Sequence, residues 1–301
     1  MNIVKYKNLF FVLSLAIIIP GIIAFSLWGL KFGIDFEGGA LWEVKVAQSA
    51  DSAKIQEFLE GQGGEVSQVA QTSQDTYLIR LKTTNEETLN NLRKDVNETF
   101  GPSEDIRLET VGPTISKELA QKAVIAVLLA IAAIVVYLTW SFRQVPKPAS
   151  SFAFGICTVI ALLHDVLLLV GVFAMLGHFF AIEVDALFIT ATLTVIGFSV
   201  HDTIVVFDRI RENLKKYDDY SFENVVNHSI LQTFARSLNT SLTAVFVLLA
   251  LFLFGGASIK TFVLALLIGI ISGTYSSIFN AAPLLIVWQN LTGRKFGLKR
   301  N

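Results

Sequence analysis

Charged residues are scarce in this chain: Asp, Glu, Lys and Arg together make up 16% of its 301 residues, against about 25% in an ordinary soluble domain. Hydrophobic residues make up 53%. This balance argues against a soluble protein and predicts a membrane protein. The net charge of −1 argues against nucleic acid as a general partner. The only cysteine, Cys157, cannot form a disulfide within the chain, so cysteine usage does not indicate the compartment.

The sequence also lacks the short motifs that carry catalysis or hold a cofactor. It contains no nucleophile elbow, no Walker phosphate loop and no His/Cys set at metal-binding spacing. Two His-Asp dipeptides, His164–Asp165 and His201–Asp202, lie 37 residues apart on different expected helices. Adjacent helical residues point about 100° apart, so neither dipeptide chelates a metal by itself. We therefore expect a protein that is not an enzyme and binds no metal and no cofactor.

Long apolar runs, by contrast, are abundant. A helix needs about 20 apolar residues to cross a bilayer, and six runs approach or exceed this length: 9–29, 122–142, 151–176, 186–207, 237–255 and 261–288. The first resembles a signal peptide, but it exceeds the roughly 7–15 apolar residues of a typical signal and lacks a clear A-x-A-like cleavage site. We interpret it as an uncleaved span, with a cleaved signal as the alternative. The expected fold is a polytopic α-helical membrane protein with six transmembrane helices.

Positive charges indicate the orientation, because Lys and Arg collect in short cytoplasmic loops. Here they precede the first run, follow the sixth, and separate the second from the third and the fourth from the fifth. These residues are Lys5, Lys7, Arg143, Lys147, Arg209, Arg211, Lys215, Lys216, Arg294, Lys295, Lys299 and Arg300. The opposite short stretches hold only Lys260. Both termini and the loop 208–236 are therefore expected in the cytoplasm.

This orientation divides the chain into a first span (1–29), an exported stretch (30–120) and spans two to six (121–301). The exported stretch shows alternating patterns of strands and spaced apolar residues of helices. We expect strands at 40–47, 65–72, 76–82 and 105–112, with helices at 49–64 and 84–101. The order β-α-β-β-α-β is that of a ferredoxin-like α+β fold. We expect this exported domain to bind or to act as a lever.

Ionisable residues inside the apolar runs are the main functional candidates, because such groups are costly in a bilayer and often mark ion or proton pathways. Asp202 lies 16 residues after Ala186, a depth of about 24 Å at 1.5 Å per residue. Arg236 lies 19 residues before Gly255, or about 28 Å from the same side. On antiparallel neighbouring helices the two would meet, and protonation of Asp202 would break their ion pair.

Each candidate also has a structural interpretation. Asp202 can be a buried polar residue that only forms hydrogen bonds between helices, and that structural interpretation is favoured for His164 and Asp165. Arg236 can extend towards lipid phosphates. His201 is a third proton-coupling candidate beside Asp202, and it can equally be an interhelical hydrogen bonder. The stretch 221–234 is expected as an amphipathic helix along the inner membrane surface.

The last run contains small residues at a spacing of four: Gly269, Gly273 and Ser277. Such spacing allows helices to approach closely. A polar strip of Thr274, Tyr275, Ser276 and Asn280 overlaps them. We interpret these residues as helix-packing contacts, with a hydrated path beside Asp202 as the alternative.

Several of these segments resemble the SecD/SecF family, and the likeness covers essentially the whole chain. The segments are "KFGIDFEGG" (31–39), "ALLHDVLLLVGVFA" (161–174), "GFSVHDTIVVFDRIREN" (197–213), "ARSLNTSLTAVFVLLALFLFGG" (235–256) and "GTYSSIFNAAPLL" (273–285). The first includes Gly33, Asp35, Gly38 and Gly39, an outer-surface signature of the family. Asp202 and Arg236 match the family's proton-responsive aspartate and its arginine in the following span.

The resemblance implies a role in protein export within the resistance–nodulation–division superfamily. Members pair with SecD beside the SecYEG channel and use the proton gradient to draw an unfolded preprotein outward. The expected location is a bacterial inner membrane, with a thylakoid membrane as an alternative, and the coupling ion is either H⁺ or Na⁺. Two other functions stay open: a proton-coupled small-molecule exporter of the same superfamily, and a passive scaffold of the translocon.

Overall fold

The computed structural model describes residues 2–292 except 49, 83, 144, 147, 148 and 218. Two compact units are present: unit 1 comprises Met1–Lys31 and Ala126–Asn301, and unit 2 comprises Phe32–Ile125. Lys147 and the four basic residues beyond Gly293, which contributed to the expected orientation, lie outside the described residues.

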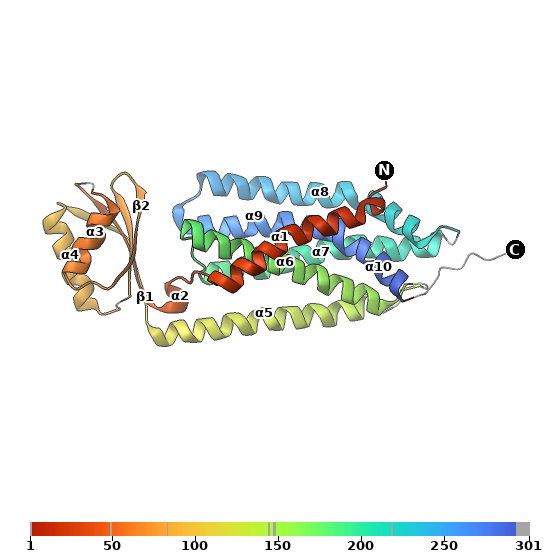
Figure 1. Ribbon diagram of the computed structural model, residues 1–301, viewed down its shortest axis with the longest axis horizontal. Helices are drawn as coiled ribbons and strands as arrows, with labels where there is room; N and C mark the ends of the chain where they lie inside the picture. Colours follow the sequence, from red (N-terminus) through yellow and green to blue (C-terminus); the bar gives the residue numbers. More distant parts are fainter. Residues whose placement is uncertain are drawn as a thin grey trace. The chain divides into compact units, whose positions relative to one another are not determined.

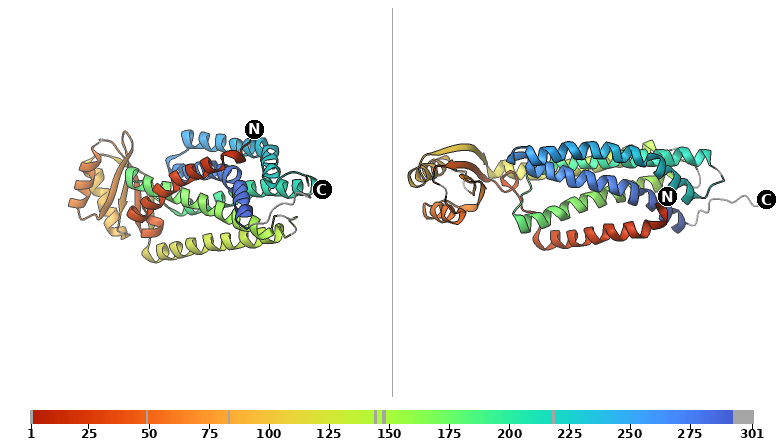
Figure 2. Two further views of the ribbon diagram at one scale, coloured as in Figure 1. Left: turned by 45° about the vertical axis from the view of Figure 1, so that its right-hand side comes forward. Right: turned by 90° about the horizontal axis from the view of Figure 1, so that it is seen from above.

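Unit 1 is a bundle of long helices (Figure 1). After a short 3₁₀ turn, η1 (Val4–Tyr6), its helices are α1 (Lys7–Trp28), α5 (Pro113–Ser141, which begins in unit 2), α6 (Ser151–Phe180), α7 (Ala186–Lys216), α8 (Phe222–Phe254), α9 (Ala257–Ser276) and α10 (Ala282–Leu291). A π-helical segment, η2 (Ser277–Ala281), joins the last two. A second view of the helices is given in Figure 2.

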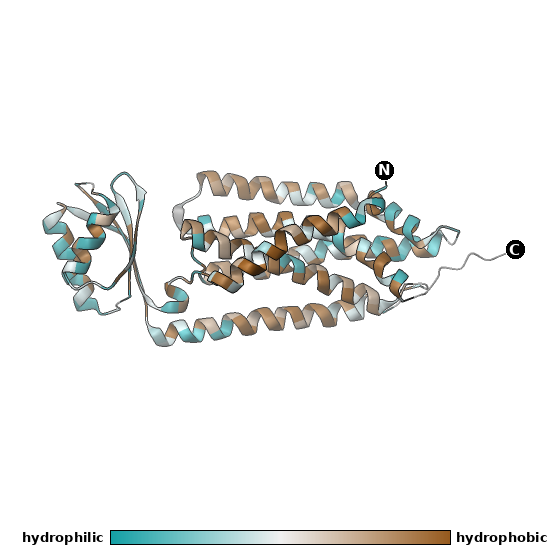
Figure 3. Ribbon diagram, viewed as in Figure 1, coloured by the Kyte–Doolittle hydropathy of each residue, from teal (hydrophilic) through white to brown (hydrophobic). Residues whose placement is uncertain are grey.

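Within the described residues, six helical segments are long and apolar enough to cross a membrane, as the sequence predicted. Apolar residues dominate their central parts (Figure 3). The helices extend beyond the apolar runs: α5 begins at Pro113, nine residues before the second run. The stretch 208–236, expected as a loop, is mostly helical, because α7 continues to Lys216 and α8 starts at Phe222. The amphipathic segment 221–234 is not a separate helix but the first part of α8.

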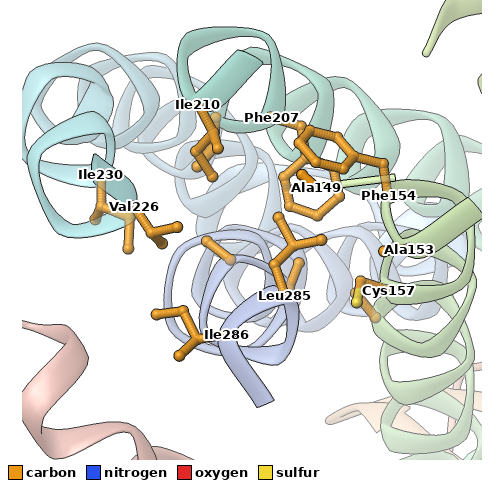
Figure 4. Close-up of a cluster of buried hydrophobic side chains, with 14 of the residues drawn as sticks. Ala149, Ala153, Phe154, Cys157, Phe207, Ile210, Val226, Ile230, Leu285 and Ile286 are labelled. Carbon is orange, nitrogen blue, oxygen red and sulfur yellow. The ribbon is translucent and has the colours of Figure 1, made fainter. Parts of the chain in front are cut away.

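An apolar core lies at one end of unit 1, where α6, α7, α8 and α10 meet (Figure 4). Phe154 and Phe207 pack edge to face, with ring centroids 4.9 Å apart. Ile210, Ile230 and Leu285 are almost fully buried around them. This packing joins the parts of α7 and α8 that extend beyond the apolar runs to the last helix.

Unit 2 contains a four-stranded antiparallel sheet and helices in the expected order. Its elements are α2 (Ile34–Glu37), β1 (Gly39–Val46), α3 (Ser52–Gly61), β2 (Val66–Ser73), β3 (Thr76–Leu81), α4 (Glu86–Thr99) and β4 (Ser103–Val111). The strands lie in the order β2-β3-β1-β4. Helices α3 and α4 cover one face of the sheet (Figure 1).

The core of unit 2 follows from the alternation of β1 and β3 and from the apolar stripes of both helices. Trp42, Tyr77 and Leu92 are each at most 1% exposed. The indole of Trp42 donates to the Asp105 carboxylate at 2.6 Å. Asp51 and Asn85 cap the first turns of α3 and α4 with their side chains. Caps of this kind satisfy backbone N–H groups that have no partner within the helix.

The signature 31–39 forms a turn that leads into the central strand. Gly33 precedes α2 and its carbonyl accepts from Phe36 N–H, while Asp35 lies inside that short helix. Gly38 and Gly39 follow with φ of 84° and 118°, values that side chains rarely adopt. A Cβ on Gly39 would lie 2.3 Å from the Leu81 carbonyl oxygen. The two glycines therefore have a backbone role in starting β1.

Replacing Gly39 by alanine is expected to destabilise unit 2 by roughly 2–4 kcal/mol, since backbone strain and a steric clash both oppose the new Cβ. Gly61→Ala is the matched control: Gly61 ends a helix and has open space around its Cβ. Denaturant unfolding of the full chain would be followed by Trp42 fluorescence, with Trp28, Trp140 and Trp288 replaced by phenylalanine. Equal midpoints for the two variants would contradict the strain argument.

Candidate functional site

Asp202 lies on α7, is 2% exposed, and faces α8 and α9. The hydroxyl groups of Ser241 and Thr274 approach its Oδ2 at 3.3 and 3.4 Å. Both hydroxyls also contact carbonyl groups within their own helices, at 2.9 Å each. A hydroxyl has one proton to donate. The Asp202 carboxylate therefore competes with backbone carbonyl groups for the hydroxyl protons of Ser241 and Thr274.

Arg236 does not pair with Asp202 in the structure, contrary to the depth argument. The arginine side chain is exposed, and within the described residues no ion pair joins it to the aspartate. Ser241, five residues further along α8, occupies the position facing Asp202. Five residues turn a helix by about 140° beyond one full revolution. Arg236 therefore lies on a different face of α8 from Ser241 and about 7.5 Å away from it along the helix axis.

His201 also lies on an exposed face of α7, away from its buried neighbour Asp202. This agrees with the expected divergence of adjacent helical residues. The structure therefore separates the three proton-coupling candidates: one is buried, and two face outward.

Asp165, on α6, is the better hydrogen-bonded of the two buried carboxylates. Ser276 donates to Oδ2 at 2.7 Å and Ser272 donates to Oδ1 at 3.0 Å, both from α9. Ser199 of α7 donates to Oδ2. On α6 itself, His164 Nδ1 lies 3.0 Å from Oδ1. Four donors from three helices thus surround one carboxylate that is 1% exposed.

The small residues of the last span lie against α7. A Cβ on Gly269 would lie 2.2 Å from Val195 Cγ2, and a Cβ on Gly273 would lie 2.9 Å from Ser199 Cβ. Ser277 Oγ lies 2.9 Å from Thr203 Oγ1. The close approach brings the hydroxyl-rich segment Ser272–Ser277 between the two carboxylates: Ser272 and Ser276 contact Asp165, and Thr274 contacts Asp202.

Sequence reasoning missed Ser199, Ser241 and Ser272 as members of these clusters. Each is a small hydroxyl residue in a membrane-length helix that carries other Ser and Thr residues, so the residue type alone does not single it out. The available signal was the spacing of Ser272 and Ser276, four residues apart on one face of α9. Across residues 2–292, apart from the six internal positions left undescribed, no group of three or more His, Cys, Asp or Glu side chains is placed to hold a metal ion.

Comparison with known proteins places this arrangement in a family. Residues 91–291 match the model of the SecD/SecF protein export membrane protein C-terminal region. The chain is 48% identical to the protein translocase subunit SecF of Thermobaculum terrenum, covering 96% of this chain and 94% of that one. It is 34% identical to the protein translocase subunit SecDF of Bacillus subtilis over 94% of this chain and 37% of that one.

A solved structure shows the same fold. The translocon-associated membrane protein SecDF from Thermus thermophilus superposes with a TM-score of 0.85 at 31% identity. The superposition covers 96% of this chain and 39% of the SecDF chain, so the present chain corresponds to part of the longer protein. From the matching family model and the high coverage of its relatives, we conclude that the chain belongs to the SecD/SecF family of protein export membrane proteins.

Proposed function

We propose that the protein is the SecF-type subunit of a bacterial Sec export machinery and couples the proton motive force to late steps of preprotein translocation. It acts in the inner membrane with SecD, beside the SecYEG channel, on an unfolded preprotein. The names of its relatives support the export role. The coupling step rests on the chain's own buried carboxylates.

One observation carries the proposal: Asp202 is almost fully buried in a helix able to span a membrane, and among the described residues no Lys or Arg forms an ion pair with it. A buried charge needs a partner, or the group takes up a proton. The competing acceptors of Ser241 and Thr274 weaken the alternative of neutralisation by hydrogen bonds. Asp202 is therefore the group whose proton occupancy would change with the packing of α7, α8 and α9.

In the second state of this switch, Asp202 forms an ion pair with Arg236. Because Arg236 lies on another face of α8 than Ser241, it reaches Asp202 only after α8 rotates or shifts. Pairing would hold the aspartate in its charged form, and protonation would release α8. The cycle thus alternates between a protonated Asp202 facing hydroxyls and a charged Asp202 facing Arg236.

The energy available from one proton limits what this cycle can do. One charge crossing 100 mV is worth about 2.3 kcal/mol, which shifts an equilibrium by one to two orders of magnitude at about 1.4 kcal/mol per tenfold. A switch from 1:99 to 99:1 needs about 5.5 kcal/mol. A decisive movement therefore requires more than one proton or a contribution from the preprotein.

Unit 2 is the part that this movement would drive. Its element order and the strand order β2-β3-β1-β4 support a ferredoxin-like fold. With both termini in the cytoplasm it is exported, where it binds the emerging preprotein and hinders its return.

The test is preprotein translocation into inverted membrane vesicles that contain the Sec channel and SecD, with the proton gradient intact or collapsed. Adding the native protein should raise completed translocation only when the gradient is present, and Arg236→Met should lose that increase. Arg209→Met, at a surface ion pair with Glu212, is the matched control. An equal increase without a gradient supports a passive scaffold and contradicts the proposal. Gradient-driven movement of a defined solute would instead indicate a small-molecule exporter.

A further inference from the structure

His164 and Asp165 form a hydrogen-bonded pair that the Asp202 switch does not use. The carboxylate of Asp165 accepts from three serine hydroxyls, and His164 Nδ1 lies 3.0 Å from its Oδ1. A carboxylate can only accept, so the Nδ1–H tautomer of His164 is the one that fits this contact. Both oxygens of Asp165 are therefore occupied as acceptors, and neither is left without a hydrogen-bond partner.

The free proton-accepting atom of the pair is His164 Nε2. If Nδ1 carries the hydrogen donated to Asp165, the neutral ring has its lone pair on Nε2. That atom is buried and has no hydrogen-bond partner, and the His164 side chain is 9% exposed. Buried polar atoms without partners are rare and often indicate a missing ligand or water. His164 Nε2, on the side of the ring opposite the Asp165 carboxylate, is therefore free to take up a proton.

The surroundings of His164 contain few other titratable groups. Its ring stacks on Tyr275 of α9, with centroids 6.4 Å apart. The contacts that reach Asp165 from α7 and α9 come from serines. Within the described part of the chain, no Lys, Arg or further carboxylate hydrogen-bonds or ion-pairs with either residue. A proton on Nε2 would thus form an imidazolium–carboxylate pair without net charge.

A second unpartnered atom lies in the polar cluster that continues towards α1. Tyr275 Oη donates to the Phe10 carbonyl at 2.8 Å and accepts a longer contact, at 3.5 Å, from Ser14. Asn280, in the π-helical segment η2, donates to Ser14 at 2.8 Å, but its Oδ1 is buried without a partner. Segments of this helix type frequently occur at functional sites, and buried polar groups of this kind are typical partners of internal water.

We propose that His164 and Asp165 form a second proton-binding site in the membrane part of the protein, separate from Asp202. Water supplies the proton to Nε2 and later receives it back, so that no other bond changes. Asp165 fixes the tautomer and balances the charge. The two sites share helices α7 and α9 but no side chain. This inference extends the proposed proton coupling and rests on it for its biological role, but the binding of the proton can be measured independently.

The experiment is ¹⁵N solid-state NMR of the full chain in lipid bilayers, labelled at histidine. The chain has four histidines, and His164→Gln identifies the signal of interest. As the pH of the sample is lowered across a titration series, we expect the His164 ring to change from the neutral Nδ1–H tautomer to an imidazolium. In Asp165→Asn the ring should stay neutral over the same range. His178→Gln, in the last turn of α6, should leave the His164 signal unchanged.

Two controls separate this site from the export switch and from misfolding. Asp202→Asn should leave the His164 charge change in place, so the second site can be present whether or not Asp202 couples export. If Asp165→Asn does not fold, the double variant Ser272→Ala/Ser276→Ala, which removes two of the four donors to Asp165, should also alter the charge change. A ring that stays neutral throughout, or that becomes charged equally with and without these partners, would overturn the proposal.

Discussion

Replacing Asp202 by asparagine is expected to abolish the part of preprotein export that depends on the proton gradient, while ATP-driven entry into the channel continues. Asparagine has nearly the same shape and can keep the contacts with Ser241 and Thr274, but it cannot bind and release a proton. Because one proton biases an equilibrium by one to two orders of magnitude at about 100 mV, the gradient-dependent rate should fall by at least about tenfold.

The measurement is translocation into vesicles with matched amounts of native or variant protein and of SecD. Asp208→Asn is the matched control, since Asp208 lies on the same helix but is exposed and ion-paired with Arg211 at 2.5 Å. This control should export normally. Retention of full gradient dependence in Asp202→Asn would assign Asp202 a structural role as a buried hydrogen-bond acceptor and would remove the basis of the proposed coupling.

The parts of this structure that the sequence predicted are those set by local patterns. Six apolar runs gave six candidate spans, because the length of a bilayer-crossing helix is fixed by membrane thickness. The strands and helices of unit 2 followed from alternation and helical spacing. Helix ends were harder to predict, because charged residues end an apolar run without ending a helix. Helix α5, for example, begins at Pro113 and passes through Lys117, Glu118 and Lys122.

Arg236 shows why the site was harder to predict than the spans. Counting residues only estimates the height of a side chain in a helix bundle: the counts placed Asp202 and Arg236 about 4 Å apart in height, whereas Arg236 lies about 7.5 Å along α8 from the residue that contacts Asp202. The face of each helix that meets its neighbour depends on packing, which a single sequence does not specify. In the structure that face of α8 carries Ser241. The same limit hid the hydroxyl groups around Asp165, which come from helices far apart in the sequence.

The crossing of α1 and α6 was missed for a related reason. Gly21 and Gly171 meet at this crossing, where a Cβ on Gly171 would lie 2.5 Å from Gly21 Cα and one on Gly21 would lie 3.0 Å from Gly171 Cα. The sequence alone shows only the small residues repeated at a spacing of four within one helix. Here each helix contributes one glycine, and the contact exists only when both are brought together.

Gly171→Leu is therefore expected to separate α1 from α6 and to cause a large loss of stability. Overpacking a well-filled interior typically lowers the free energy of unfolding by about 1–3 kcal/mol and occasionally by more. A leucine side chain at position 171 would point at the backbone of α1, so its cost should be at least about 3 kcal/mol. Gly155→Leu is the matched control, because Gly155 lies on the same helix and a Cβ added there would meet no atom within 4 Å. Thermal unfolding in detergent should give a clearly lower Tm for Gly171→Leu and a near-native value for the control.

A local reporter can show that the loss arises at this crossing. Trp28 of α1 stacks on His178 of α6 with ring centroids 4.0 Å apart and planes inclined by 3°. In a chain whose other tryptophans are replaced by phenylalanine, the Trp28 emission should change in Gly171→Leu and stay native in Gly155→Leu. Such a result would tie the position of α1 to one glycine of α6. Because α1 also contacts Tyr275 and Asn280 through Phe10 and Ser14, its displacement should disturb the polar cluster next to His164. Unchanged emission with an unchanged Tm would mean that the helices tolerate the side chain and that the close approach is not needed for the fold.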